Sequence, residues 1–371
     1  MVKDSNKEVF FELLRAGLWE KEVRLSQYKD IDYSAILKLA EEQSVVGLIT
    51  AGLEHVVDVK VPQTDLLQFI GNTMQIEQRN KSMNVFVARL IEKLRKDDIF
   101  TLLVKGQGIA QCYERPLWRA CGDVDLLFSE GNYEKAQKIL LPLALETEDE
   151  DKSLKHHGMT MEGGFVVELH GTLHSHISKH INKCIDRVQD CIFFDGKVRS
   201  WLNGNTQIFL PAPDNDVIIV FTHIIQHFFD GGIGLRQICD WCRLLWTYRD
   251  SLNHRLLESR LCEMGLMSKW KAFAALVVGT LSMQVEAMPL YSVGNKWEKK
   301  AERILSLVLE SGNFGHGRDM GYKKRYPRVF EYAISFWVYT RYCIRLFMIF
   351  PINAVNGWGR IMRLGVKAKM K

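Results

Sequence analysis

Residues 122–128 read Gly-Asp-Val-Asp-Leu-Leu-Phe, and the rest of the chain is best understood outward from them. In an extended strand, successive side chains point to opposite faces, so Asp123 and Asp125 share one face while Val124 and Leu126 share the other. Adjacent carboxylates repel each other unless a cation or a proton compensates them, and carboxylate oxygens are the ligands that Mg²⁺ prefers. The stretch therefore predicts a strand that is buried on one side and holds a metal ion on the other.

A third acid lies in residues 165–170, Phe-Val-Val-Glu-Leu-His, where Glu168 interrupts an otherwise apolar strand. Glu168 would complete a three-carboxylate site if this strand lies beside the first. His170 falls on the same strand face, where it could orient the acid, contact a phosphate or make a structural hydrogen bond. The competing interpretation is a solvated edge strand at 123–125 with Glu168 as its outward-facing neighbour.

A glycine-containing turn lies upstream of the paired aspartates. The run Ile-Phe-Thr-Leu-Leu-Val at 99–104 is prone to form a strand and ends in Lys105-Gly106-Gln107-Gly108. Glycine lets the backbone approach a phosphate, and the start of a helix offers unpaired N–H groups. We expect a phosphate-binding turn here, followed by a short helix at 109–113 and a turn at 114–116.

The remaining pattern predicts an α+β protein, in which a small mixed sheet is flanked by helical regions. A helix is expected at 133–141, and two strands at 160–161 and 165–170 are expected to join through Gly163-Gly164. Apolar residues recur at helical intervals before residue 97 and again after residue 211, where Asp214 or Asn215 is a suitable N-cap. We therefore expect three units at 1–96, 97–210 and 211–371.

The bulk composition is that of a soluble globular protein. The 371 residues are 47% hydrophobic and 25% charged, which argues against global disorder. No export signal is visible at the N-terminus, and the eight cysteines are scattered, so we expect a reducing cytoplasm and ordinary thiols. The formal charge of +5 does not by itself indicate nucleic acid.

Four segments stand out by charge, hydropathy or glycine content. Acids crowd at 146–151, which favours a solvated loop, and the basic end at 360–371 is either a solvated tail or a contact for anionic partners. Residues 332–350 are the one stretch that suggests a transmembrane span, but Arg341 and Arg345 lie within it, and each cation costs about 2.5–3.5 kcal/mol there. We expect an amphipathic helix instead, packed on the protein or on a membrane surface. Residues 311–321 are predicted to form a glycine-rich loop.

Several of these segments together resemble a known family. They are LLVKGQGIAQCYERPLWRACGDVDLLF, VVELHGTLH, FTHIIQHFF and GLRQICDWCRLL. Over roughly residues 30–330, the chain is similar to the uncharacterised bacterial nucleotidyltransferase family of the DNA polymerase β superfamily. The resemblance implies a strand, a glycine turn and a helix, then a D-x-D pair on the next strand and a third acid on a later one.

The resemblance also implies roles for individual residues. Asp123, Asp125 and Glu168 would be the catalytic, metal-binding carboxylates, and Gly106 would be the phosphate-turn glycine. Lys105 would contact phosphate, and Arg119 could neutralise it or lie at the surface. The superfamily usually has Ser or Gly after this glycine, whereas Gln107 stands here. Glu168 would hold the catalytic metal or help to deprotonate the acceptor, and the sequence leaves both roles open.

The implied activity is Mg²⁺-dependent transfer of an NMP group from a nucleoside triphosphate to an acceptor, with release of pyrophosphate and two ions at the site. The acceptor would be a small molecule, a saccharide or a protein. The alternative is an inactive nucleotide-binding interaction protein on the same fold, which the departure at Gln107 keeps open. A nucleic-acid polymerase is disfavoured because no long basic groove is visible.

Other candidate pairs have weaker support. His223 and His227 stand four apart on a predicted helix; they could be buried and hydrogen-bonded, could face the cleft, or, least favoured, could bind zinc. Cys239 and Cys242 lack a second cysteine pair, which favours core packing. Arg236 and Asp240 are expected to pair along one helix, and the resemblance implies that they lie toward the cleft.

Overall fold

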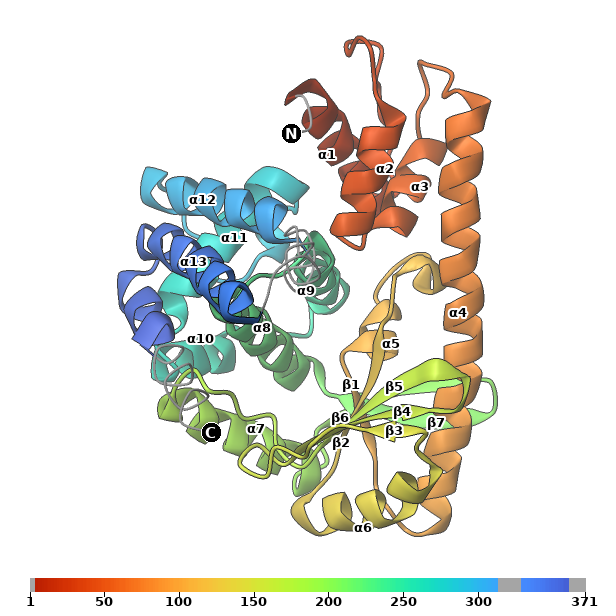
Figure 1. Ribbon diagram of the computed structural model, residues 1–371, viewed down its shortest axis with the longest axis vertical. Helices are drawn as coiled ribbons and strands as arrows, with labels where there is room; N and C mark the ends of the chain where they lie inside the picture. The colour runs from red at the N-terminus through yellow and green to blue at the C-terminus, as the bar shows by residue number, and fades with distance from the viewer. Residues whose placement is uncertain (1–3, 313–327, 360–371) are drawn as a thin grey trace.

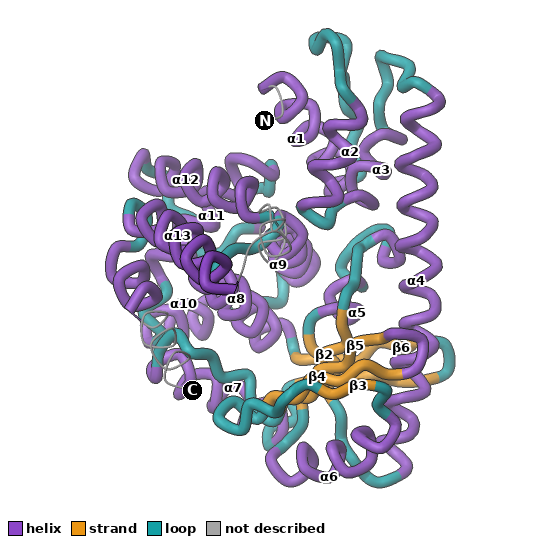
Figure 2. Tube along the Cα trace, in the orientation of Figure 1, coloured by secondary structure: helices purple, strands orange, loops and turns teal. Residues whose placement is uncertain are grey.

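The computed structural model describes residues 4–312 and 328–359, and its strands form one block between helical regions (Figures 1 and 2). The sheet has seven strands in the order β3-β4-β5-β2-β1-β7-β6. It is mixed, because β2 pairs with β5 and β1 pairs with β7 in parallel, whereas the other neighbours are antiparallel. The strands are β1 (Leu102–Val104), β2 (Asp123–Leu127), β3 (Glu146–Thr147), β4 (His156–Met161), β5 (Phe165–His170), β6 (Val198–Asn203) and β7 (Thr206–Pro211).

Helices precede the sheet, connect its strands and follow it. The first group is α1 (Asp4–Trp19), α2 (Tyr33–Glu42), α3 (Val46–Glu54) and α4 (Gln63–Lys96). The connecting helices are α5 (Gly106–Ala110), α6 (Glu130–Leu140) and α7 (Lys179–Phe193). The last group is α8 (Pro213–Asp230), α9 (Leu235–Tyr248), α10 (His254–Glu263), α11 (Met267–Leu281), α12 (Asn295–Ser311) and α13 (Arg328–Phe347). The expected α+β class is confirmed, although the sheet is larger than predicted.

One face of the sheet is apolar and is covered by helices. Val124 and Leu126 of β2 and Val167 of β5 lie in a buried cluster with residues of α4 and α6. The second half of α4 supplies buried side chains at helical spacing, namely Met83, Val87, Leu90, Ile91 and Leu94. Because alternate strand residues point to opposite faces, burying this set leaves Asp123 and Asp125 on the other face, where they share a pocket with residues of α5 and α8.

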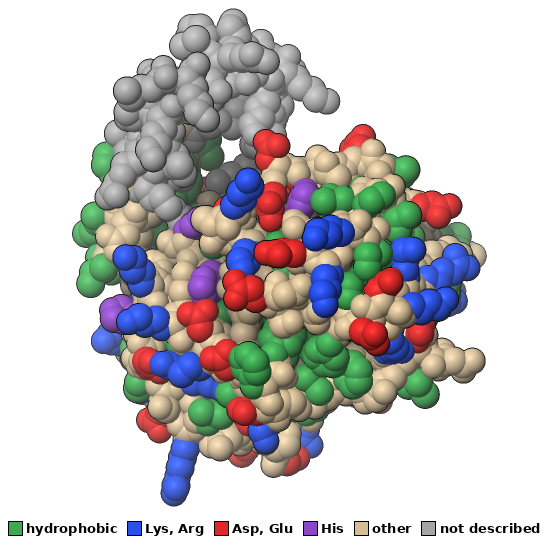
Figure 3. Space-filling view, turned by 90° about the horizontal axis from the view of Figure 1, so that it is seen from below, with side chains coloured by type: hydrophobic (Ala, Val, Ile, Leu, Met, Phe, Trp, Pro, Cys, Tyr) green, Lys and Arg blue, Asp and Glu red, His purple; other side chains and the backbone are tan. Residues whose placement is uncertain are grey.

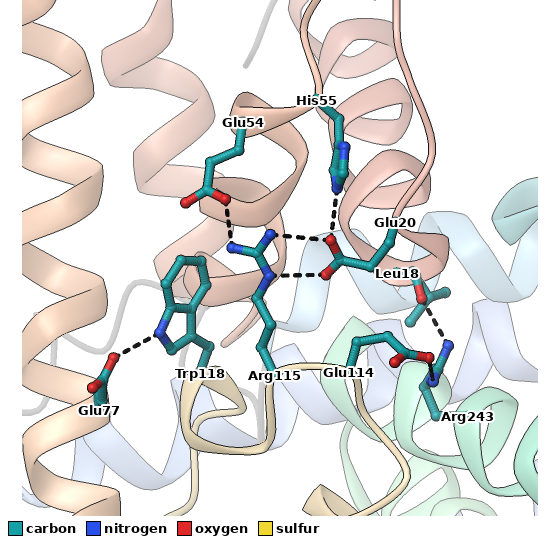
Figure 4. Close-up of polar contacts among 9 residues, drawn as sticks. All are labelled: Leu18, Glu20, Glu54, His55, Glu77, Glu114, Arg115, Trp118 and Arg243. Atoms are coloured by element: carbon teal, nitrogen blue, oxygen red, sulfur yellow. Dashed lines mark hydrogen bonds and ion pairs between the residues drawn. The ribbon is translucent and has the colours of Figure 1, made fainter.

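A network of ion pairs ties the turn before β2 to the first helices (Figure 4). The Arg115 guanidinium donates to Glu20, with its Nε 3.0 Å from Oε1, and to Glu54, with its Nη1 2.6 Å from Oε2. The indole of Trp118 donates to Glu77 of α4 over 2.8 Å. These contacts anchor residues 114–119, the segment that leads directly into the aspartate strand.

Several boundaries differ from the predicted ones: the strand expected at 160–161 begins at His156, and the acidic stretch expected as a loop begins with the strand β3. The helix after β1 begins at Gly106 and not at 109, directly at the end of the glycine turn. The helix after β7 begins at Pro213 with Ala212 as N-cap, so Asp214 and Asn215 are not caps but lie in the first turn. Proline fits this first position because it lacks the N–H that would be unsatisfied there and its φ is already helical.

Some elements of the structure were not predicted, and some predicted segments lie in residues that the structure does not describe. The hairpin of β6 and β7 and the helix α7 were not predicted. Most of the expected glycine-rich loop (residues 313–321) and the basic tail at 360–371 lie outside the described residues. None of the helices in the described part of the chain is long and apolar enough to cross a membrane.

Candidate active site

The carboxylates converge because β2 and β5 are adjacent and parallel. Asp125 lies directly opposite Glu168 in the register, and Leu127 lies opposite His170. Opposite residues on neighbouring strands project to the same face, so both aspartates, Glu168 and His170 share the polar face. The strand β2 lies between β5 and β1 and is not an edge strand, so the competing edge-strand interpretation is wrong.

Asp125 is the most deeply buried acid of the group, with 2% of the residue exposed. One of its oxygens, Oδ1, lies 2.7 Å from the Lys105 Nζ and 2.9 Å from the His170 Nε2. Burial works against a charged Lys105, but the negative charges of Asp125, Glu168 and Asp123 outweigh it and raise the pKa of the ammonium. Burial likewise opposes a charged His170, yet its bonds to Asp125 and Glu168 raise the pKa of that imidazole.

Glu168 lies between two imidazoles. Its Oε2 is 3.2 Å from the His156 Nε2 and 3.5 Å from the His170 Nε2. Burial tends to raise the pKa of this carboxyl, but hydrogen bonds from His156 and His170 and the charge of Lys105 lower it overall. Glu168 is therefore ionised at neutral pH.

Asp123 differs from the other two acids because none of the described residues gives it a hydrogen bond or an ion pair. Burial and the neighbouring charge of Asp125 raise the pKa of its carboxyl. A carboxylate that is partly buried beside another carboxylate, without a compensating partner, is stabilised by a bound cation. The donor set of Asp123, Asp125 and Glu168 thus fits Mg²⁺, which prefers hard oxygen ligands.

Asp123 and Glu168 border a cavity of about 260 Å³ between the sheet and α8, and Asp125 lines a smaller pocket that shares Lys105 and Asp123 with it. Lys105, Asp123, Glu168 and several histidines line the larger cavity, and α8 contributes His223 and His227 on its opposite wall. Those two rings are 4.3 Å apart. Burial and the charge of Lys105 keep the pKa of His223 well below its ordinary value and lower that of His227 to about 4, so both are neutral at pH 7. Of the alternatives above, the structure places this pair facing the cleft.

The turn after β1 has an unusual backbone. Lys105 has a φ of 56° and a ψ of −143°, and Gly106 has a φ of 39°. A side chain at Gly106 would be strained by this φ, and its Cβ would lie 3.4 Å from the carbonyl oxygen of Asp123. Residues with side chains seldom adopt positive φ, and when they do they concentrate at ligand-binding sites. The turn aims the Lys105 ammonium at the carboxylates.

Two residues expected at the nucleotide direct their side chains elsewhere. Gln107 is buried; its Nε2 donates to Asn80 of α4 over 3.3 Å, and its Oε1 accepts from the Cys121 thiol over 3.1 Å. Arg119 donates through Nε and Nη2 to the two carboxylate oxygens of Asp240 over 2.9 and 2.6 Å. Neither side chain lines the 260 Å³ cavity, although Arg119 lines the smaller pocket beside Asp123 and Asp125.

The expected helix pair of Arg236 and Asp240 is therefore wrong. Asp240 is occupied by Arg119 and by the hydroxyl of Tyr113, which donates to it over 2.8 Å. Arg236 donates instead to the carbonyl oxygen of Ala120 over 2.9 Å. The planar fork of Arg119 meets both carboxylate oxygens at once, an arrangement stronger than a single contact along a helix.

The sequence did not predict that His156 lies next to Glu168. His156 pairs with His170 across the β4–β5 hairpin, and the two rings are 4.9 Å apart. The glycine turn at 163–164 sets this register, so counting outward from it would have placed His156 beside His170. Cys239 and Cys242 are buried free thiols in the core, as predicted.

Comparison with known proteins identifies a family for this chain. No curated protein matches the chain. Among solved structures, an antigenic nucleotidyltransferase-like protein from Paracoccidioides brasiliensis is similar, with 15% identity and a TM-score of 0.32 over 54% of this chain and 93% of that chain. A family described as uncharacterised nucleotidyltransferase matches residues 29–278, and the chain belongs to that family.

Proposed function

We propose that this protein is a Mg²⁺-dependent nucleotidyltransferase, which moves an NMP group from a nucleoside triphosphate to an acceptor and releases pyrophosphate. The observation that carries the proposal is the arrangement of Asp123, Asp125 and Glu168 on one face of β2 and β5, at the wall of a cavity. Family membership supports the reaction class.

Asp123, Asp125 and Glu168 would hold the metal, with two ions expected. Bound Mg²⁺ supplies charge neutralisation for the triphosphate and for pyrophosphate as it leaves. Lys105 already points at this site, and its ammonium binds a phosphate oxygen once the carboxylates have another cation as partner. Glu168 helps to hold the metal or accepts the proton of the acceptor.

The acceptor is proposed to lie between the sheet and α8. There the neutral imidazoles of His223 and His227 offer hydrogen bonds without adding charge. Small molecules, saccharides and protein side chains all remain acceptor classes. On the face shown in Figure 3, acidic and basic side chains of the described residues are interspersed, which does not favour nucleic acid as the partner.

Two further features bear on this proposal, the first on activity and the second on the compartment of the protein. The departure at Gln107 kept an inactive protein open as an alternative, but this side chain is buried away from the cavity and does not fill the phosphate turn. All eight cysteines are free, which suits a reducing compartment such as the cytoplasm.

Asp123→Asn gives the sharpest test. Because Asp123 lacks a partner and its pKa is raised, its neutralisation should leave Tm unchanged or slightly higher, while pyrophosphate release falls by at least about a hundredfold. The assay measures pyrophosphate from ATP, GTP, CTP and UTP, with and without Mg²⁺ and with candidate acceptors. Glu146→Gln, in the exposed strand β3, is the matched control and should retain turnover.

Thermal stabilisation by a nucleotide without pyrophosphate release from any nucleotide would favour the binding-only alternative. Full turnover in Asp123→Asn would overturn the assignment of the carboxylates.

A further inference from the structure

Three potential ligand atoms of mixed type meet at one edge of the carboxylate site. They are one ring nitrogen each of His156 and His170 and one carboxylate oxygen of Glu168, and they all lie within 4.8 Å of one another. The two nitrogen–oxygen separations are 3.2 and 3.5 Å. The three residues come from the paired strands β4 and β5, so the backbone fixes their spacing.

These separations fit one tetrahedral metal ion. Zinc binds imidazole nitrogen at about 2.0–2.1 Å and carboxylate oxygen at about 2.0–2.2 Å, so two tetrahedral ligands lie about 3.3–3.5 Å apart. Both measured nitrogen–oxygen distances agree with that spacing to within about 0.2 Å. The ligand nitrogens of His156 and His170 lie within 4.8 Å of each other, and the two rings would approach to the tetrahedral spacing when they share one ion.

The chemistry of the donors also selects the ion. Magnesium prefers oxygen ligands, whereas imidazole favours zinc and its transition-metal neighbours. All three residues border the 260 Å³ cavity, which leaves room for a fourth ligand from water or substrate. Three protein ligands and one open position is the arrangement of catalytic rather than structural zinc sites.

We propose that His156, Glu168 and His170 bind a divalent transition metal of the zinc class, with an open coordination position toward the cavity. On binding the ion, the His170 Nε2 that now faces Asp125 would lose its proton to solvent, and the freed lone pair would turn with the ring toward the ion. This inference deepens the proposed function, on which it rests through the shared Glu168. The ion would occupy one of the two cation positions, beside Mg²⁺ on Asp123 and Asp125.

Neighbouring histidines do not form an equivalent group. His174, which lines the same cavity, pairs with Asp186 of α7. His223 and His227 have no carboxylate in a ligand cluster with them among the described residues. The site is therefore specific to the β4–β5 hairpin, and the other histidines serve as controls.

The experiment titrates the chelator-treated full-length protein with Co²⁺ and Zn²⁺ in the absence of nucleotide. Cobalt reports its geometry through visible absorption, and zinc affinity is measured by calorimetry in the presence of millimolar Mg²⁺. We expect one ion per chain with a tetrahedral cobalt spectrum. His156→Gln should weaken zinc binding by at least about tenfold, and His174→Gln should not change it.

Circular dichroism of each variant verifies the fold, and Glu168→Gln provides a second ligand variant if His156→Gln fails to fold. Zinc binding that survives both ligand variants, or that is lost in His174→Gln or His223→Gln instead, would overturn the proposal. Asp123→Asn separates the two proposals: it should abolish pyrophosphate release but leave the cobalt spectrum. A wild-type protein that binds cobalt as expected but transfers no nucleotide would contradict only the proposed function.

Discussion

Gln107 illustrates how burial determines what a single residue contributes. It follows the phosphate-turn glycine, where the superfamily pattern has a small residue, but its amide group is bonded to Asn80 and Cys121 in the interior. A buried polar group that loses its partners costs more than the bond itself contributes. The side chain at 107 therefore holds α5 against α4 and the approach to β2.

Replacing Gln107 by Ser restores the superfamily pattern and should nevertheless be harmful. The variant loses both amide contacts and leaves a small void, so the free energy of unfolding should fall by about 1–3 kcal/mol. Urea unfolding measures this change. Gln111→Ser, at the partly buried end of α5, is the control and should cost less.

The nucleotide affinity of Gln107→Ser, measured by thermal shift, should equal that of the wild type because the Gln107 side chain does not reach the cavity. A gain in nucleotide affinity would show that Gln107 obstructs the phosphate turn.

Single residues also show which parts of the site were readable in the sequence. The alternation of Asp123 and Asp125 with apolar residues required only strand geometry, and the structure bears out that geometry. The partner of Asp240 was not readable, since Arg119 is separated from it by 121 positions while Arg236 stands one helical turn away. Spacing along the helix favours the nearer Arg236. A buried carboxylate, however, is stabilised most by a guanidinium that donates to both of its oxygens, as Arg119 does for Asp240.

At the scale of elements, the Arg119–Asp240 pair connects the approach to β2 with α9. Both side chains are almost fully buried, with 4% and 5% exposed. Removing one member leaves the other charge without compensation, so Arg119→Met or Asp240→Leu should each cost about 3–5 kcal/mol of unfolding free energy.

The double variant should be destabilised by much less than the sum of the two single changes, because it buries no unpaired charge. Urea unfolding of all four proteins gives the coupling energy. Additive losses would mean that the two residues contribute independently and do not hold the elements together as a pair.

Asp58 predicts a pH dependence in the first helical region. Its carboxylate accepts from the backbone N–H groups of Leu25 and Ser26 over 2.8 and 3.0 Å and so joins the loop after α1 to the loop after α3. Hydrogen bonding, with Ser26 as the largest contributor, lowers the pKa of Asp58 to about 2 from 3.8. The folded protein therefore favours the ionised form, and this contribution to stability is present above pH 3.8 and is lost as the pH falls toward 2.

Asp58→Asn should lower Tm at neutral pH, and the gap from wild type should narrow between pH 3.8 and about 2, wherever both proteins stay folded. Thermal denaturation by circular dichroism over this range measures the gap. If the difference in Tm between wild type and Asp58→Asn were the same at every pH, the charge of Asp58 would not be the cause of the destabilisation.

The missed elements had local signals of their own. Asn203-Gly204 between β6 and β7 is a common hairpin turn, and β7 buries alternate residues (Thr206, Ile208 and Leu210), but no residue of β6 is fully buried. The helix α7 buries residues at helical spacing, namely Ile181, Cys184, Ile185, Val188 and Ile192, so its signal was present in the sequence and was missed. Glycine turns and most periodic segments thus predicted much of the fold, whereas β6 forms only against the rest of the sheet.

At the scale of the whole molecule, one hydrophobic cluster contains residues from all three of the expected units, 1–96, 97–210 and 211–371. It runs from Phe10 in α1 through Val104 in β1 to Trp241 in α9. The second cluster joins the end of α4 to the sheet. We propose that the divisions at 1–96, 97–210 and 211–371 mark changes of secondary structure and not units that fold alone.

A chain that begins at residue 97 tests this proposal. It lacks the cover that α4 gives to Leu103, Val124 and Leu126, so it should bind a hydrophobic dye strongly and aggregate. A chain that begins at Gln63 keeps α4 and should bind less dye. Equal dye binding by the two fragments, or a stable fold for the shorter one, would show that the chain after residue 96 folds without α4, as the division at 96/97 implies.

The length of α4 has a consequence for how this sequence can change. Its 34 residues are shared between two packing partners, α3 at one end and the sheet at the other. Deleting one residue midway would turn the two ends by about 100° relative to each other around the helix axis, and three or four residues are needed to restore their facing. Natural insertions or deletions should therefore spare the middle of this helix and collect in the loops that flank it.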